Sequence, residues 1–320
     1  MKVKGDGGGG MSRAQFLRLA AGAAGALATG SLLGSAGLAM AADRPVLRRP
    51  IPSSGELLPV IGVGTAVAYE IEASDAKFPL LVDSVRGFLD NGGSLIDTSP
   101  TYGRAEKNLG EIFRRTGQRK QAFLATKIST SGEQSGIDQV AASMRDMGTE
   151  RLDLLQVHNI RDTATHLRTI RRLKDEGKVR YVGITTSFDN AYGEFERIVQ
   201  GEKLDFIQID YALDNRNAEE RILPLARDRG MAVLINLPFG RGRLFSRARG
   251  KPLPAFAAEI DCTSWAQFFL KFLLANPAVT AVIPGTDRPE FAIDNLNAAR
   301  GRIPDARMRE QMIRFWEQLS

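Results

Sequence analysis

From about residue 56 onward, short apolar runs alternate with longer amphipathic segments. The runs lie at 60–65, 94–97, 122–127, 152–158, 180–186, 205–210, 231–236 and 281–285. Their apolar residues are continuous rather than alternating with polar ones, which is typical of parallel strands covered on both faces. The segments between them place apolar side chains at helical spacing, as Leu81, Val85, Phe88 and Leu89 do. The pattern therefore predicts parallel strands, each followed by a helix.

The number of these strand and helix units indicates how the sheet is arranged. Eight units within roughly 260 residues favour an α/β fold of the closed (β/α)8 type, a TIM barrel, over an open sheet. The stretch 48–60, RRPIPSSGELLPV, is expected to form a hairpin that closes the barrel floor. The tail predicts one further helix, with Met308, Met312, Phe315 and Trp316 facing the core. We assign residues 42–320 to this one domain.

The first 41 residues have the layout of a signal peptide for export. A basic start precedes an Ala/Gly/Leu-rich stretch without charge between Arg18 and Asp43, and the small residues Ala39 and Ala41 suit cleavage after Ala41. The segment 12–18, SRAQFLR, resembles a twin-arginine motif, with Ala14 in place of the second arginine. The alternative is a buried or membrane-spanning helix, for which so many Ala and Gly residues are a weak composition. For residues 1–10, the alternative is a misassigned start, with Met11 as the true initiator.

Charge and cysteine content narrow the class of protein. The net charge is +6, and half of it lies in residues 1–41, which hold four basic side chains and one acidic one. The body has no dense basic run, so no nucleic-acid partner is expected. Cys262 is the single cysteine, which excludes an internal disulfide and argues against structural zinc, and no metal ligand is assigned. We expect contact with a membrane and with export machinery only during export.

Several predicted strands end on polar residues that a hydrophobic core would not select. These are Asp97, Lys127, His158, Thr185, Gln208 and Asn236. In a barrel of parallel strands, all of these ends lie at one rim, where barrel active sites are built. The pattern therefore predicts a polar site at the carboxyl ends of the strands.

Four residues at this rim suggest chemistry on a carbonyl group. A buried Lys127 needs a counter-ion, and Asp97 on the neighbouring strand can provide it. A cation beside a phenol favours phenolate, so we expect Lys127 to lower the pKa of Tyr102 and make it a usable general acid. His158 can donate a hydrogen bond to a carbonyl oxygen. The alternatives are a structural ion pair and a core histidine; His166, the other histidine, is expected at the surface.

The motifs around these residues resemble those of the aldo-keto reductase family over nearly all of residues 56–300. IDTSPTYGRAEKNLGEIF is similar to the family's Asp and Tyr signature, FLATKI to its lysine strand, and LDLLQVHNI to its histidine strand. The resemblance implies that Asp97, Tyr102, Lys127 and His158 are the catalytic tetrad. It also implies NAD(P)H-dependent, reversible reduction of an aldehyde or ketone to an alcohol. A barrel that binds a nucleotide or a partner with little turnover remains the alternative, because fold does not establish activity.

The resemblance also implies where the nicotinamide cofactor binds. The nicotinamide contacts it implies are Gly64, Thr65, Thr185 and Gln208, with Tyr211 stacked on the ring. Position 186 is a departure, since Thr186 lacks the amide of the family's Ser-Asn pair. The loop PFGRGRL is similar to the family's pyrophosphate loop, and this implies contacts from Pro238, Gly240, Arg241 and Gly242.

Cofactor choice, substrate and location are less sharply defined by the sequence. Gly285 and Thr286 take the places of a family Lys-Ser pair, Arg288 can substitute as a phosphate ligand, and Asn295 matches the adenine contact. NADPH is favoured, and NADH stays open. Asn159 and Phe239 are expected to line the mouth for a small carbonyl substrate, and no arginine is identified as a carboxylate clamp. The leader predicts a periplasmic protein, or a cytoplasmic one if the leader is not functional.

Overall fold

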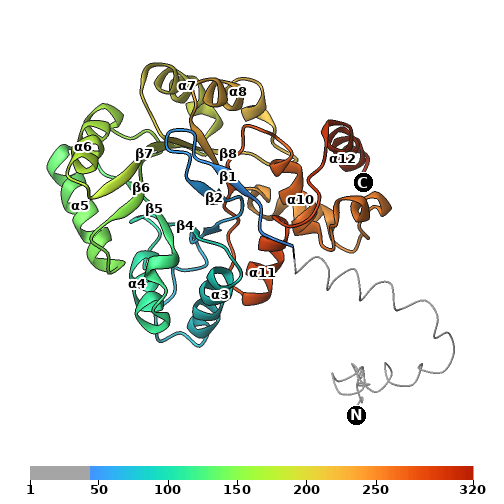
Figure 1. Cartoon of the computed structure of the whole chain (residues 1–320), viewed down its shortest axis with the longest axis horizontal. Helices are drawn as coiled ribbons and strands as arrows, with labels where there is room; N and C mark the ends of the chain where they lie inside the picture. The colour runs from blue at the N-terminus through green and yellow to red at the C-terminus, as the bar shows by residue number, and fades with distance from the viewer. Residues whose placement is uncertain (1–43, 320) are drawn as a thin grey trace, which may run out of the picture. The chain divides into compact units, whose positions relative to one another are not determined.

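The apolar runs form a parallel barrel in the computed structural model, which describes residues 44–319 (Figure 1). The predicted signal peptide and the alternative start at Met11 lie outside the described residues. The barrel strands are β3 (Val63–Gly64), β4 (Leu95–Asp97), β5 (Phe123–Ile128), β6 (Leu152–His158), β7 (Val179–Thr185), β8 (Phe206–Asp210), β9 (Ala232–Asn236) and β10 (Ala281–Val282). Each pairs in parallel with its neighbour in chain order. Bridges from Ile61 to Val282 and from Gly64 to Gly285 join the two edges, so the predicted (β/α)8 fold is confirmed.

Helices surround the barrel and cover the outer faces of the strands (Figure 1). They are α3 (Phe78–Asp90), α4 (Ala105–Thr116), α5 (Glu133–Asp146), α6 (Thr163–Asp175), α7 (Tyr192–Gly201), α8 (Ile222–Asp228), α9 (Arg243–Ala248), α10 (Trp265–Leu274), α11 (Pro289–Asn297) and α12 (Ala306–Gln318). The predicted tail helix is α12, which begins where the Asp305 side chain accepts a hydrogen bond from the Met308 amide. Its Met312 and Trp316 are buried, as predicted.

The predicted hairpin crosses one opening of the barrel (Figure 1). It consists of β1 (Arg48–Pro50) and β2 (Leu57–Pro59), paired antiparallel. Ile51 and Leu58 from the hairpin are buried among interior side chains such as Phe123 and Phe206. Burial of each such side chain contributes about 1.5–3 kcal/mol, so the hairpin stabilises the end of the barrel opposite the polar rim.

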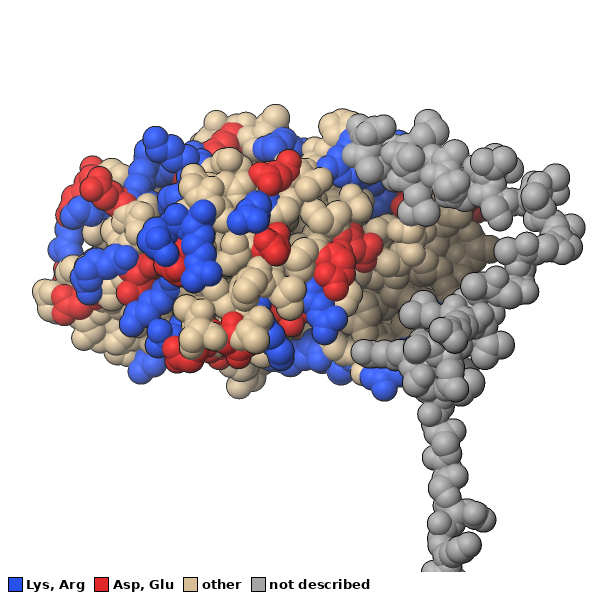
Figure 2. Space-filling model, turned by 90° about the horizontal axis from the view of Figure 1, so that it is seen from below, with Lys and Arg blue, Asp and Glu red and all other residues tan. Residues whose placement is uncertain are grey.

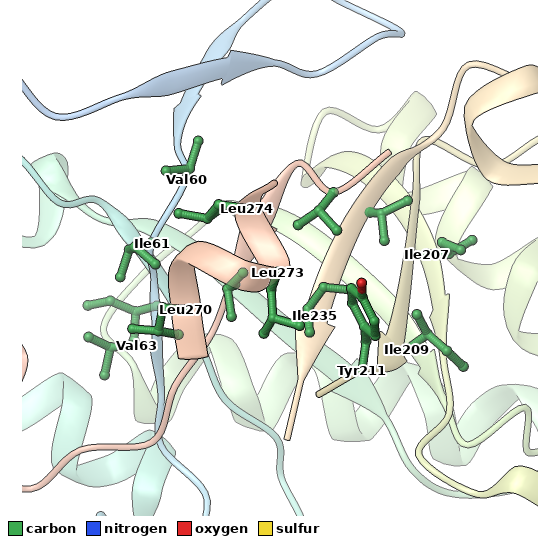
Figure 3. Close-up of a cluster of buried hydrophobic side chains, with 14 of the residues drawn as sticks. Val60, Ile61, Val63, Ile207, Ile209, Tyr211, Ile235, Leu270, Leu273 and Leu274 are labelled. Carbon is green, nitrogen blue, oxygen red and sulfur yellow. The ribbon is translucent and has the colours of Figure 1, made fainter. Parts of the chain in front are cut away.

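A second layer of the core lies between the strands and the outer helices. Figure 3 shows Leu270, Leu273 and Leu274 of α10 next to Ile235 of β9 and Val63 of β3. These side chains are almost fully buried. Because both faces of the strands are covered, most strand positions are apolar until the strand reaches the rim.

Strand register brings the polar strand ends to a common level. Gly64 pairs with Asp97, His158 with Thr185, and Thr185 with Gln208. At the next interface Asp210 pairs with Asn236. Side chains that are far apart in sequence therefore meet at one end of the barrel.

His166 is buried, and its predicted surface position is wrong. It lies in α6 on the same face as Thr169, Ile170 and Leu173, which are also buried. Its Nε2 lies 2.8 Å from the carbonyl oxygen of Thr130, while its buried Nδ1 has no hydrogen-bond partner within residues 44–319. The helical spacing of these residues was the available signal, because residues three, four and seven positions apart share one helix face.

Two features describe the outside of the domain: the distribution of its charges and the hydropathy of its helices. Figure 2 shows basic and acidic side chains interspersed over the visible face rather than gathered into one broad patch of either sign. None of the helices in residues 44–319 has the length and apolar character of a transmembrane span.

Candidate active site

The carboxylate, phenol, ammonium and imidazole selected from the sequence lie around one cavity of about 550 Å³ at the rim. Lys127 Nζ is 2.8 Å from Asp97 Oδ2 and 2.6 Å from the carbonyl oxygen of Thr98. It also lies 5.1 Å from the centroid of the Tyr102 ring. The rings of Tyr102 and His158 meet edge to face, with centroids 6.0 Å apart. These distances place a cation, a phenol and an imidazole within reach of one small carbonyl group.

A tight turn after β4 positions Tyr102. The Tyr102 amide donates to the Ser99 carbonyl oxygen at 3.0 Å, and the Tyr102 carbonyl oxygen accepts from the Ala105 amide at 2.9 Å. Gly103 has φ of +50°, a backbone conformation that glycine adopts readily. The turn thus directs the phenol back over the barrel mouth before α4 begins at Ala105.

Burial governs the ionisation of the ion pair and of the tyrosine. Burial disfavours the charged form of Lys127, but electrostatic attraction and hydrogen bonds to Asp97 and Tyr102 together outweigh this effect and raise the lysine pKa. Burial also raises the pKa of Tyr102, and the opposing effect of Lys127 is smaller. The expectation that Lys127 lowers this pKa below its ordinary value is therefore wrong. The tyrosine retains its proton at neutral pH, which a proton donor requires.

His158 is held as a neutral imidazole. Burial and the nearby Lys127 charge lower its pKa to about 3. Its Nδ1 lies within hydrogen-bond distance of Ser129 Oγ and 3.3 Å from Ser99 Oγ. With the Ser129 hydroxyl as the donor to Nδ1, the ring proton is on Nε2, which is then free to donate to a substrate oxygen.

This electrostatic arrangement predicts a flat pH profile for carbonyl reduction at constant cofactor. His158 is neutral and Tyr102 protonated throughout, so kcat/KM should show no titration between about pH 5 and pH 8. The measurement is the steady-state rate across this range in buffers of constant ionic strength. A change in kcat/KM with a midpoint at about pH 6.5, the ordinary histidine pKa, would contradict the neutral state assigned to His158.

The same cavity contains most of the residues implied for the cofactor and the substrate. They are Gly64, Thr65, Thr185, Gln208, Pro238, Arg241, Gly242 and Gly285, together with Asn159 and Phe239. Two observations fit a nicotinamide here. A Cβ at Gly242 would have no neighbour within 4 Å, and one at Gly285 would meet only the Gly64 carbonyl oxygen at 3.8 Å, so both glycines leave room for a flat group. Asn236 Oδ1 is buried without a hydrogen-bond partner and suits a carboxamide donor.

Five of the implied cofactor residues do not line this cavity. Tyr211 and Gly240 line a neighbouring cavity of about 1050 Å³, which shares Ser187, Leu237 and Arg241 with the tetrad cavity. The Tyr211 hydroxyl lies within hydrogen-bond distance of Glu219 and Arg309. Tyr211 is fully buried, and it does not line the cavity that contains the tetrad. Thr286, Arg288 and Asn295 lie further out, in and just before α11.

Several lining residues were not assigned from the sequence. Asn236 ends β9, where its Nδ2 donates to the Thr186 carbonyl oxygen at 3.4 Å. Asn236 thereby places a side-chain amide next to Thr186, whose own side chain has no amide. Its place at a strand end was the available signal. Ser99 and Ser129 gave no comparable signal, because their contact with His158 joins separate loops.

A (β/α)8 barrel whose rim holds this lysine, carboxylate, tyrosine and histidine beside a cavity that fits a nicotinamide defines an oxidoreductase of carbonyl compounds. Residues 60–311 match the sequence model of the Aldo/keto reductase family. The chain belongs to this family of NAD(P)H-dependent oxidoreductases.

Individual relatives and solved structures agree with this assignment. The chain is 30% identical over 181 residues to the aldo-keto reductase YhdN of Bacillus subtilis, a match that spans 51% of this chain and 53% of YhdN. It is 29% identical to the methylglyoxal reductase YeaE of Escherichia coli, over 73% of this chain and 84% of that one. An aldo-keto reductase of Klebsiella pneumoniae in complex with NADPH has the same fold, with a TM-score of 0.70 at 22% identity over 85% and 95% of the two chains.

Proposed function

We propose that this protein reduces an aldehyde or ketone to an alcohol, reversibly, with NADPH as the favoured cofactor and Tyr102 as the proton donor. The observation that carries the proposal is the buried pair of Lys127 and Asp97 directly beside the Tyr102 ring, with His158 across the same cavity. A structural ion pair alone would not require a phenol and an imidazole at the same cavity.

The tetrad acts on the carbonyl oxygen. NADPH, when bound, supplies the hydride that adds to the carbonyl carbon. Tyr102 then donates its hydroxyl proton to the oxygen, which becomes the alcohol oxygen. Lys127 stabilises the phenolate that forms, since its ammonium lies over the ring. In the oxidative direction the phenolate accepts the proton from the alcohol.

His158 and the ion pair have supporting roles. The Nε2 hydrogen of neutral His158 orients the carbonyl oxygen while negative charge develops on it. Asp97 keeps the buried Lys127 charged and fixes its position, with help from the Thr98 carbonyl oxygen. These groups are pre-positioned, so little reorganisation is needed during the reaction.

NADPH is favoured over NADH on two grounds. Arg288 precedes α11 with its side chain largely exposed, so that it can meet a phosphate on the adenosine side. Structural neighbours from Klebsiella pneumoniae were solved with NADP or NADPH, although one Escherichia coli relative is an NADH-specific methylglyoxal reductase. NADH therefore remains a second cofactor to be assayed.

The test is an assay of the purified protein with NADPH or NADH and a panel of small aldehydes and ketones, which includes methylglyoxal. Oxidation of the nicotinamide that depends on the carbonyl compound supports the proposal. Binding of NADPH with no turnover of any compound would favour the alternative, a nucleotide-binding barrel. Thr186 favours that alternative, because it lacks the side-chain amide that the family resemblance implies as a nicotinamide contact at this position.

For location, we propose export to the periplasm with the cofactor already bound. The support is the signal-like composition of residues 1–41 together with a cofactor that the periplasm does not readily supply. Protein isolated from periplasm is expected to contain nucleotide, measurable by mass spectrometry after denaturation. Periplasmic protein that contains no nucleotide, yet is fully active once NADPH is added, would contradict loaded export. Exclusive recovery from cytoplasm would show that the leader is not functional.

A further inference from the structure

A second, smaller cavity adjoins the tetrad cavity at His158 and Asn159. It has a volume of about 480 Å³ and is lined by Thr101, Ser129, His158, Asn159 and Arg161. His158 and Asn159 also line the tetrad cavity, so the two cavities border each other at these residues. A molecule with its carbonyl oxygen at Tyr102 can therefore extend past Asn159 toward Arg161.

The backbone that leads to Arg161 is strained. Asn159, Ile160 and Asp162 have φ of 51°, 49° and 50°, and Ile160 is a β-branched residue for which such a value is a genuine outlier. The Arg161 amide donates to the His158 carbonyl oxygen at 3.1 Å, which closes the turn immediately after the catalytic strand. Strained non-glycine residues persist where surrounding structure holds them, and they concentrate at functional sites.

Two contacts hold this turn in place from outside. The Asp162 carboxylate accepts from the Gly132 amide at 2.8 Å, and the Thr163 hydroxyl donates to the Ile160 carbonyl oxygen at 2.7 Å. Because Asp162 is engaged in this way, the nearest carboxylate in sequence already has a backbone partner. The turn therefore sets the position of the Arg161 side chain relative to His158.

The Arg161 guanidinium is fixed along one edge only. Its Nε donates to Ser131 Oγ at 3.1 Å, and its Nη1 donates to the Ser129 carbonyl oxygen at 3.3 Å. Within residues 44–319 it forms no ion pair with a carboxylate. Its Nη2 has no hydrogen-bond partner in this part of the chain, so donors remain for a ligand.

The cavity as a whole suits an anion. None of its five lining residues is acidic, and Arg161 is the basic one among them. The hydroxyls of Ser129 and Thr101 already have partners in His158 Nδ1 and Ser99 Oγ, so the anion is bound by the guanidinium. A guanidinium with free donors matches the planar, bidentate geometry of a carboxylate.

We propose that this cavity is an anion subsite, and that the protein acts on aldehydes that carry a carboxylate a short carbon chain away from the carbonyl group. The proposal rests on the reductase function proposed above and specifies its substrate class. Arg161 binds the carboxylate, while the carbonyl oxygen lies between Tyr102 and His158.

Two four-carbon aldehydes test this subsite, since 4-oxobutanoate carries a carboxylate where butanal carries a methyl group. The readout is the ratio of kcat/KM for 4-oxobutanoate to that for butanal, from which any loss of active protein cancels. The purified protein should give a ratio above about ten, and Arg161→Gln should lower it by about tenfold or more. Arg161→Lys retains the charge without the planar fork and should recover part of the ratio.

The matched control is Arg168→Gln, which removes the same charge from an exposed position of α6 away from both cavities. Its ratio should equal that of the unmodified protein. A ratio near or below one in the unmodified protein, or an equal fall in both glutamine variants, would overturn the anion subsite while leaving the reductase function intact. Failure to reduce any aldehyde in the panel would instead remove the proposed function and this inference together.

Discussion

Replacement of Tyr102 by phenylalanine should lower kcat for aldehyde reduction by about 10²–10⁴-fold, the range for loss of a positioned general acid. The substitution removes only the hydroxyl and leaves the ring packed between Lys127 and His158. NADPH binding, followed by quenching of protein fluorescence, should stay within about threefold because the hydroxyl acts on the substrate. The combination of lost turnover with retained binding separates a catalytic role from a structural one.

The matched control is Tyr192→Phe. The Tyr192 hydroxyl donates to Asp210 Oδ1 at 2.9 Å, so this variant also loses one half-buried phenolic hydrogen bond. Tyr192 lies outside the tetrad cavity, and its variant should keep kcat within about twofold. Similar rates for Tyr102→Phe and the unmodified protein would exclude the proposed proton donor.

Replacement of Asp97 by alanine should lower the free energy of unfolding by about 3–5 kcal/mol, because it leaves the buried Lys127 charge without its counter-ion. The side chains of both residues are almost completely inaccessible to solvent, so water cannot screen the charge that remains. Urea denaturation measures the change, and activity should fall in the same variant as Lys127 loses its fixed position.

A double variant separates the two effects of this ion pair. Asp97→Ala combined with Lys127→Met removes both charges, and the stability should recover most of the loss, since an apolar replacement of a buried pair is often neutral. Activity should stay low, because no ammonium is left to stabilise the Tyr102 phenolate. A double variant as unstable as Asp97→Ala alone would mean that shape, not charge, dominates at this position.

The elements of the barrel were largely predictable from local pattern. Continuous apolar runs bounded by turns predicted the strands. The predicted length was furthest from the observed one for β3 and β10, which are shorter than the runs 60–65 and 281–285. The hairpin before β3 was likewise predicted, within the stretch 48–60. The prediction for His166 was wrong because it did not use the position of His166 on the same helix face as Ile170.

The candidate site was predictable only where residue type and strand end coincided. Asp97, Lys127 and His158 each end or nearly end a strand, and in a parallel barrel such ends must meet. Tyr211 shows the limit of this reasoning. It follows a strand end directly, yet its hydroxyl meets Glu219 and Arg309 and its ring does not line the tetrad cavity.

By itself, the sequence determined the parallel barrel and the common rim of Asp97, Lys127 and His158, because apolar periodicity and strand polarity are local properties that lead to one closed topology. Tyr102 lies five positions beyond its strand end, and its assignment came from the motif that contains it. Only the tertiary structure decided the ionisation of Tyr102 and the hydroxyl contacts of His158. It alone also placed Arg161 beside the site. The reason is physical: burial, and contacts between loops far apart in sequence, depend on how the whole chain packs, and no local pattern records them.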